Sequence, residues 1–148
     1  MQLCEAALKV SEQGTTQFES LNVLAPIKEI KNRLSDNNTR VKERATEILL
    51  IISQHSVTGM QLVLQELTRP LPAATAKTLW TERLNCCQKI LRQDRSNLQR
   101  RQKSNEPSIK HCLYLALAGF SNTKEEVRLA SHLVILEIYQ IIGRYSLM

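Results

Sequence analysis

The segment LSDNNTRVKERATEILLIIS, residues 34–53, places a cluster of turn-forming residues and two basic residues before a helix that becomes almost wholly apolar. Asp and Asn adopt turn geometry readily and also cap helix N-termini. The apolar residues that follow, from Val41 onward, recur at helical spacing and predict a helix over about residues 39–54. A helix that is apolar around most of its circumference has to be covered on several sides. The segment therefore predicts a helix held inside a layered, helical fold.

The composition of the 148-residue chain also favours helices over strands. It is 43% hydrophobic but only 4% aromatic, with four Gly and four Pro, whereas sandwiches and barrels need many aromatic and turn-forming residues. Apolar runs such as residues 48–52 are far shorter than the roughly 20 residues of a membrane span. The N-terminus MQLCEAALKV lacks the basic start and apolar centre of a secretory signal. We therefore expect a cytoplasmic protein with no membrane segment.

No pattern of catalytic or metal-binding residues stands out. The four cysteines have no CxxC spacing, and the three histidines stand apart from one another, so we expect no metal site. The glycine-rich phosphate loops, the HExxH motif and the GxSxG elbow are absent from the sequence. Cys86 and Cys87 are interpreted as small apolar residues on a helix face, although a histidine brought close by the fold would make them nucleophile candidates. We expect a protein that is not an enzyme and needs no cofactor.

Apolar residues at helical spacing divide the rest of the chain into further helices. Pro26 is compatible with its predicted helix only in the first turn. Residues 94–107 are polar and basic, and we expect them to form a solvated loop between repeats. The expected helices cover about residues 2–12, 21–34, 39–54, 58–67, 76–93, 108–118 and 124–143.

Three of these helices superpose at a constant spacing of 43 residues, which lies in the range of HEAT-type repeats. In such repeats a shorter helix precedes a turn, a more apolar helix follows it, and stacking buries the second helix. We therefore predict one all-α domain over residues 1–148, a right-handed α-solenoid of about three to four HEAT-type (ARM/HEAT) helical hairpins. The aligned positions are Val41, Leu84 and Val127, followed seven residues later by Ile48, Leu91 and Val134.

One pattern occurs twice at the start of a predicted second helix. NNTRVK (37–42) and NTKEEVR (122–128) each place Asn and a capping residue before Val and a basic residue. With the helices that they open, these stretches resemble HEAT repeats of TOG domains, the tubulin-binding modules of microtubule regulators. The loop LTRPLPAATAKT (67–78) and the helix after it are most similar to the TOG domains of ciliary-tip centrosomal proteins. The resemblance covers about residues 20–145.

The resemblance implies a non-catalytic module that binds tubulin, or another acidic protein surface, through the row of turns that precede the second helices. It also implies a cytoskeletal location at the centrosome, centriole or cilium. Basic side chains on such turns make charge-assisted contacts with carboxylates and steer association. The matching positions are Asn38, Thr39, Arg40 and Lys42 in one turn, Thr75, Lys77 and Thr78 in the next, and Asn122, Lys124 and Arg128 in the third.

The chain departs from a full TOG domain at its start. It begins within what would be the second of about six repeats, so the first turn and its exposed aromatic residue fall outside the resemblance. Trp80 is not a replacement, because its position beside Leu79 and Leu84 predicts a core residue. The helix expected over residues 2–12 resembles a second helix without its partner, and its uncovered face predicts self-association through the N-terminal end.

Other interpretations of the same residues stay open. The turn residues cap helices whether or not a partner binds, and Lys42 and Arg128 are also suited to a structural role through bonds to a neighbouring repeat. A general HEAT or armadillo scaffold needs no tubulin-specific residue. The formal charge of +6 comes entirely from residues 75–148 and allows a nucleic-acid binder, although the basic segment carries no aromatic residues for base stacking.

Overall fold

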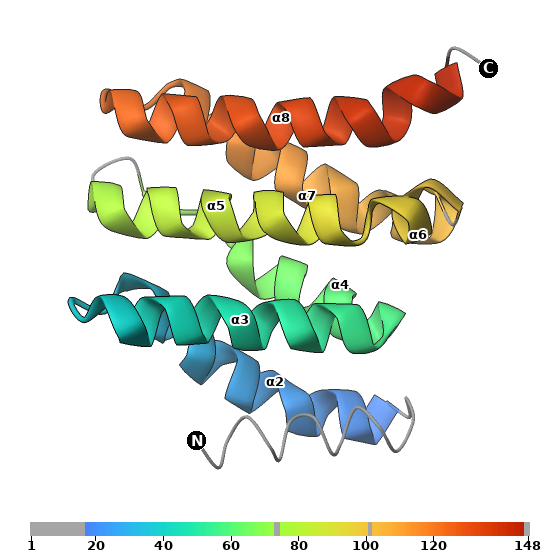
Figure 1. The fold of residues 1–148 in the computed structure, drawn as a ribbon, viewed down its shortest axis with the longest axis horizontal. Coiled ribbons are helices and arrows are strands. Elements are labelled where there is room, and N and C mark those ends of the chain that lie inside the picture. Colours follow the sequence, from blue (N-terminus) through green and yellow to red (C-terminus); the bar gives the residue numbers. More distant parts are fainter. Residues whose placement is uncertain (1–16, 73–74, 101, 147–148) are drawn as a thin grey trace. The chain divides into compact units, whose positions relative to one another are not determined.

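The computed structural model describes residues 17–72, 75–100 and 102–146, without the side chains of residues 17–23, 100, 102–105 and 144–146. Over these ranges the protein is all-helical and contains no strand, which confirms the predicted fold class (Figure 1). The chain divides into two compact units, Met1–Glu66 (unit 1) and Leu67–Met148 (unit 2). The sequence predicted one domain, and the stacking of its hairpins into a right-handed solenoid stays a prediction. The helix expected over residues 2–12 lies outside the described residues.

Unit 1 contains α2 (Gln17–Asn32), the short 3₁₀ helix η1 (Arg33–Ser35), α3 (Thr39–His55) and nearly all of α4 (Val57–Leu67). Helices α2 and α3 form a hairpin with η1 between them. The extended backbone of Asp36 ends the helical path after η1, and that of Asn38 starts α3.

Pro26 lies well inside α2, so the expectation that it occupies the first turn is wrong. The helix begins earlier than the apolar pattern indicates, because the preceding residues QFES contain no helix breaker. Pro26 has no N–H, so the helix runs through it with one backbone hydrogen bond fewer.

Apolar side chains at helical spacing form the core of unit 1. The buried positions include Ile27 and Ile30 on α2, Leu34 on η1, and Ile48 and Ile52 on α3. Since each buried leucine or isoleucine contributes about 1.5–3 kcal/mol, these contacts favour the hairpin over separate helices. Burial does not surround α3 completely, because Ile51 is 45% exposed.

One buried ion pair joins two helices of unit 1. The Lys31 ammonium on α2 donates to the Glu66 carboxylate on α4 over 3.1 Å, and the two side chains are 11% and 1% exposed. Both charges have lost most of their hydration, so each depends on the other more than an exposed pair would. The pair fixes α2 against the end of α4.

Unit 2 contains α5 (Lys77–Gln93), α6 (Arg95–Arg100), α7 (Gln102–Phe120) and α8 (Glu125–Ser146). The loop expected over residues 94–107 is wrong for most of this segment, since α6 and the start of α7 occupy it. The polar composition of this segment gave no indication of its buried residue. Leu98 is fully buried, and its N–H donates to Asp94 O over 2.9 Å. Pro107 lies inside α7, and the helix continues through it.

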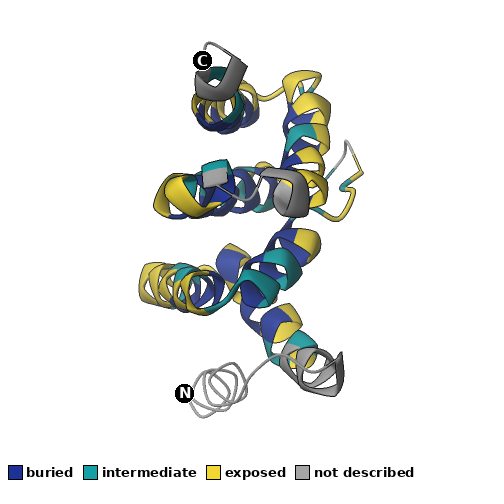
Figure 2. Ribbon diagram, turned by 90° about the vertical axis from the view of Figure 1, so that its right-hand side faces the viewer, coloured by how far each residue is buried: buried dark blue, intermediate teal, exposed yellow. Residues whose placement is uncertain are grey.

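Helix α8 packs against both α7 and α5, and its buried side faces them while the opposite side is exposed (Figures 1 and 2). Gly119 permits this close approach, because a Cβ there would overlap the Ser131 hydroxyl and touch Leu84 Cδ1. Ser131 is fully buried, and its hydroxyl donates to Val127 O over 2.8 Å within α8. Three helices therefore meet at a single residue without a side chain.

Trp80 belongs to the core, as the sequence predicted, with 2% of its surface exposed. Its Nε1–H has no hydrogen-bond partner among the described residues. The indole is therefore held in place by apolar packing.

The 43-residue spacing holds between α3 and α8 but not at α5. The three helices start at residues 39, 77 and 125, which are 38 and 48 residues apart. Val41 and Val127 are each the third residue of their helix, whereas Leu84 is the eighth residue of α5. The even spacing therefore selected a residue of α5 that lies about one and a half helical turns beyond the position equivalent to Val41 and Val127. The residue at the equivalent position, the third of α5, is Leu79.

We predict that Gly119→Ala lowers the free energy of unfolding by about 1–3 kcal/mol, because the added methyl group has to displace a buried side chain. Ser131→Ala removes the hydroxyl that the methyl group meets, so Gly119→Ala combined with Ser131→Ala should regain much of the loss. Urea denaturation followed by circular dichroism measures both. Equal destabilisation in the single and double variants would contradict the packing at this residue.

We predict that Lys31→Met lowers the free energy of unfolding by about 3 kcal/mol, because the Glu66 carboxylate then stays buried without its ammonium partner. Replacing both residues, with Lys31→Met and Glu66→Leu, should return stability to near the wild-type value, since no buried charge is left. Thermal and urea denaturation of the two variants measures the difference. A Lys31→Met protein as stable as the wild type would refute a structural role for the pair.

Candidate functional site: the helix-start turns

The first predicted turn, residues 36–42 (turn 1), is organised by two side-chain oxygens of unit 1. Asp36 Oδ1 accepts from the Asn38 N–H, and Asn38 Oδ1 accepts from the Arg40 N–H, both over 2.9 Å. Asn38 O accepts the first helical bond of α3, from the Lys42 N–H over 3.1 Å. These bonds cap α3 and leave the side chains of Asn38, Thr39 and Arg40 exposed, while Lys42 is half-buried.

The third predicted turn, residues 122–128 (turn 3), repeats this geometry in unit 2. Asn122 Oδ1 accepts from the Lys124 N–H over 2.9 Å, and Lys124 O accepts from the Arg128 N–H over 3.2 Å. Asn122 and Lys124 therefore take the places that Asp36 and Asn38 hold 86 residues earlier.

Arg128 has a structural role in turn 3. Its Nη1 donates to Asn122 O and Thr123 O, both over 3.0 Å, so the guanidinium closes the turn that it follows. Arg128 therefore has a structural role, but its bonds are with its own turn rather than with a neighbouring repeat as expected. The exposed Lys124 is the predicted basic residue of this turn that projects from it.

The second predicted turn, residues 75–80 (turn 2), is built differently. Ala76 O accepts from the N–H groups of Leu79 and Trp80, and no side chain caps α5. Thr75 and Thr78 are half-buried, whereas Lys77 is exposed. Lys77 is therefore the predicted partner-binding residue of turn 2 that is most accessible.

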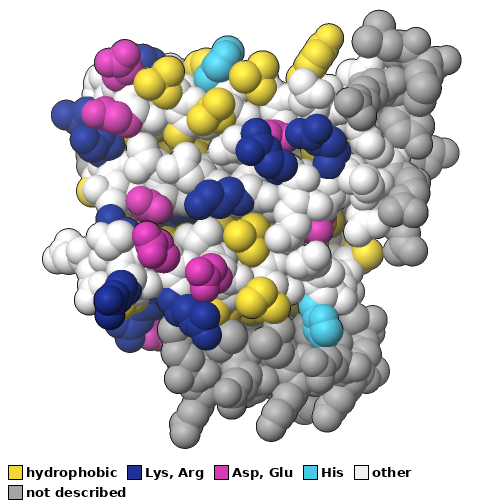
Figure 3. Space-filling view, viewed as in Figure 1, with side chains coloured by type: hydrophobic (Ala, Val, Ile, Leu, Met, Phe, Trp, Pro, Cys, Tyr) yellow, Lys and Arg dark blue, Asp and Glu magenta, His cyan; other side chains and the backbone are white. Residues whose placement is uncertain are grey.

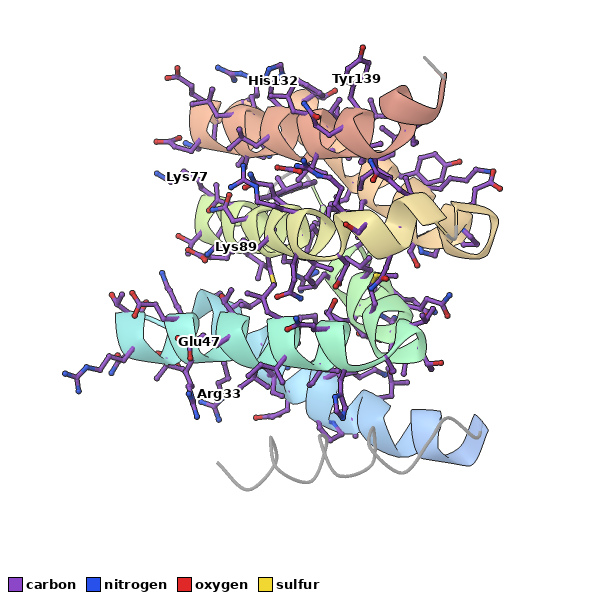
Figure 4. All side chains as sticks on the ribbon, turned by 45° about the vertical axis from the view of Figure 1, so that its right-hand side comes forward. Arg33, Glu47, Lys77, Lys89, His132 and Tyr139 are labelled. Atoms are coloured by element: carbon purple, nitrogen blue, oxygen red, sulfur yellow. The ribbon has the colours of Figure 1, made fainter. Side chains whose placement is uncertain are left out.

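Turns 2 and 3 lie next to each other within unit 2. Lys77 Nζ reaches Glu126 Oε1 of α8 over 3.4 Å, and both side chains are about half exposed (Figure 4). The Glu126 backbone N–H and Lys77 both hold the pKa of the Glu126 carboxyl below its usual value. With its neighbour Glu125, Glu126 makes the first turn of α8 acidic. Both residues stand inside the motif NTKEEVR, from which only the Asn and the basic residues had been selected as candidates.

Arg92 and Arg95, at the end of α5 and the start of α6, both form ion pairs inside unit 2. The Glu137 carboxylate, whose side chain is 6% exposed, accepts from Arg92 Nε over 3.1 Å and from Arg95 Nη2 over 2.7 Å. Pairing with a buried carboxylate fixes α5 and the start of α6 against α8, although the Arg92 side chain itself is 69% exposed. On the face in Figure 3, basic and acidic side chains are interspersed and no large basic patch forms among the residues shown in colour.

The described cysteines lack the properties of nucleophiles. Burial, followed by the neighbouring Cys87, raises the pKa of the Cys86 thiol far above its usual value. A hydrogen bond with Cys112, followed by burial, raises the pKa of Cys87 in the same direction. All three thiols are therefore small buried groups, as predicted for Cys86 and Cys87. Cys4 lies outside the described residues.

In the described part of the chain, no group of three or more His, Cys, Asp or Glu side chains is arranged to hold a metal ion. No helix within it has the length and apolar character needed to span a bilayer.

The described fold defines the class of the protein, which is all-helical. In each of the hairpins α2–α3 and α7–α8, a capped turn connects the two helices. A more particular assignment does not come from comparison. No protein-family model matches the sequence, and none of the curated proteins or solved structures compared with it is significantly similar.

We predict that Asn38→Ala lowers the free energy of unfolding by about 1 kcal/mol, because the Arg40 N–H loses its side-chain acceptor. Asn38→Asp keeps an oxygen at the same place and should stay close to wild-type stability. Chemical denaturation of the two variants tests this difference. Equal losses in both would show that the side chain does not cap α3.

Proposed function

We propose that this chain is a non-catalytic, TOG-like helical-repeat module that binds tubulin through its helix-start turns, and that it acts at the centrosome or cilium. The sequence resemblance, nearest to the TOG domain of the centrosomal protein of 104 kDa, suggests the partner. The observation that carries the proposal is the pair of capped turns 86 residues apart. Turn 1 is fixed by the side-chain oxygens of Asp36 and Asn38, and turn 3 by that of Asn122. Each turn presents an exposed basic residue, Arg40 in turn 1 and Lys124 in turn 3.

The capped turns suit recognition because their backbone conformation is set before a partner arrives. Asx-type hydrogen bonds hold turn 1 and turn 3, so little chain entropy is lost there on binding. The exposed Asn38 and Thr39 supply polar groups beside Arg40, and basic side chains of this kind pair with carboxylates. Tubulin offers the acidic surface that this arrangement requires.

The acidic residues of turn 3 shape the contact in unit 2. Lys77 is paired with Glu126 in the free protein, so a tubulin carboxylate has to compete for that ammonium group. The pair is exposed and its contribution is small, so the exchange requires little free energy. We therefore expect turn 1 to contribute more of the affinity and unit 2 to contribute mainly to orientation.

A general protein-binding scaffold is the second candidate, and the acidic start of α8 favours it. Glu125 and Glu126 sit among the basic residues of unit 2, so this part of the surface also suits a partner of mixed charge. Nucleic-acid binding has less support, because Arg92 and Arg95 are paired with the buried Glu137.

We predict that tubulin binding falls at least tenfold when Arg40, Lys77 and Lys124 are all changed to Ala. All three side chains are exposed on the turns, and losing three charge-assisted contacts accounts for a decrease of this size. Co-sedimentation with microtubules and size exclusion with free tubulin, at low and physiological salt, measure the binding.

The matched control changes three exposed lysines away from the turns, Lys28, Lys89 and Lys110, to Ala and removes the same charge. Binding should survive in the control at physiological salt. An equal loss in both variants would show a general charge effect and refute a turn-specific site. A wild-type chain that binds neither free tubulin nor microtubules would favour the scaffold.

A further inference from the structure

The outer side of α8 carries an apolar stripe that no described element covers. Leu129, Leu133 and Leu136 are 57%, 43% and 45% exposed, and Tyr139 is 63% exposed. Their spacing places them on one side of the helix, opposite the face that contacts α5 and α7. His132 and Tyr139 project from this side, away from the rest of unit 2 (Figure 4).

The stripe continues onto the end of α7. The rings of Phe120 and His132 meet edge to face, with centroids 6.2 Å apart and planes at 79°. Leu117 lies one turn before Phe120 and is 49% exposed, and Tyr114 is exposed one turn earlier still. We call these side chains the α7–α8 face. It contains seven of the eight large hydrophobic residues exposed in the described chain, and the eighth, Ile51, lies in unit 1.

The α8 part of this face is almost free of charge. Between residues 129 and 140 the one Asp, Glu, Lys or Arg is Glu137, which is turned inward and paired with Arg92 and Arg95. The ion pairs of unit 2 therefore remove a carboxylate from α8 and leave its outer side apolar. A large uncharged patch on a chain with a formal charge of +6 is typical of a protein-interaction surface.

We propose that the α7–α8 face binds a second copy of this chain in a two-fold symmetric dimer. Taking roughly 200 Å² for each large side chain and the exposed fractions, the seven residues offer on the order of 700 Å² per copy. A standard stable interface takes about 800 Å² from each partner, so self-association covers this face with little area left over.

A two-fold dimer also fits the order of residues along the stripe. Antiparallel α8 helices place the Leu129 end of one stripe beside the Tyr139 end of the other, with Leu133 and Leu136 near the two-fold axis, and the contact is the same from both sides. Because the facing residues are uncharged, the arrangement brings no like charges together, whereas a strongly acidic or basic partner would gain nothing from this face. The proposal does not depend on tubulin, and it concerns a different surface from the N-terminal end.

Sedimentation velocity and light scattering across a concentration series, up to about 200 µM, test the proposal with the full chain. The wild type should shift from monomer to dimer with a dissociation constant in the micromolar range or below. Leu133→Glu combined with Leu136→Glu should weaken dimerisation at least tenfold, since each dimer would then bury four carboxylates at its centre.

The control is Ile51→Glu, which introduces a carboxylate at the exposed hydrophobic residue outside the face and should leave the dimer unchanged. Circular dichroism of each variant confirms folding, because all three positions are exposed. A wild type that stays monomeric throughout, or a dimer that survives the Leu133→Glu and Leu136→Glu changes, would overturn the proposal. Tubulin binding of the same variants should equal that of the wild type, so the two proposals fail separately.

Discussion

The arrangement of unit 2 depends on the missing side chain at Gly119. Because α7 has no Cβ there, it approaches close enough to α8 for Ser131 and Leu84 to share one junction. This junction sets α8 beside both α7 and α5. Two further contacts depend on that position, the Lys77–Glu126 pair at the start of the helices and the Glu137 clamp on Arg92 and Arg95 nearer their ends. A methyl group at residue 119 therefore affects contacts at the start and in the middle of α8.

The charges of unit 2 are distributed by this packing. Its basic residues are numerous, yet Arg92 and Arg95 are engaged by a buried carboxylate and Arg128 closes its own turn. On the turns of unit 2, the exposed basic residues are Lys124, Lys77 in its exposed pair, and Arg128 in its own turn. The net charge of the chain is therefore a poor guide to its surface. Specific turns with fixed backbones are better candidates for recognition than the basic segment.

Helical periodicity predicted most of the fold, because apolar stripes and capping residues act over a few positions. The bounds of α3, α4 and α5 agree with their expected ranges to within one residue. Failures occurred where distant contacts decide. Leu98 and Asp94 order a segment whose composition is typical of a loop, and Pro26 is tolerated inside α2. The even 43-residue spacing missed the shift at α5 because a repeat period cannot register unequal connections. The candidate turns were predicted from the sequence, but the pairing of Glu126 with Lys77 and the hydrogen bonds of Arg128 within its own turn are seen only in the structure.

The central claim is that the capped helix starts, rather than the apolar face of α8, contact the partner. Hydrogen–deuterium exchange of the full chain, with and without saturating tubulin, tests this most directly. We predict that tubulin slows exchange in residues 36–42, 75–80 and 122–128 and leaves residues 129–139 unchanged. Slower exchange confined to residues 129–139, or no change anywhere at saturation, would contradict the account.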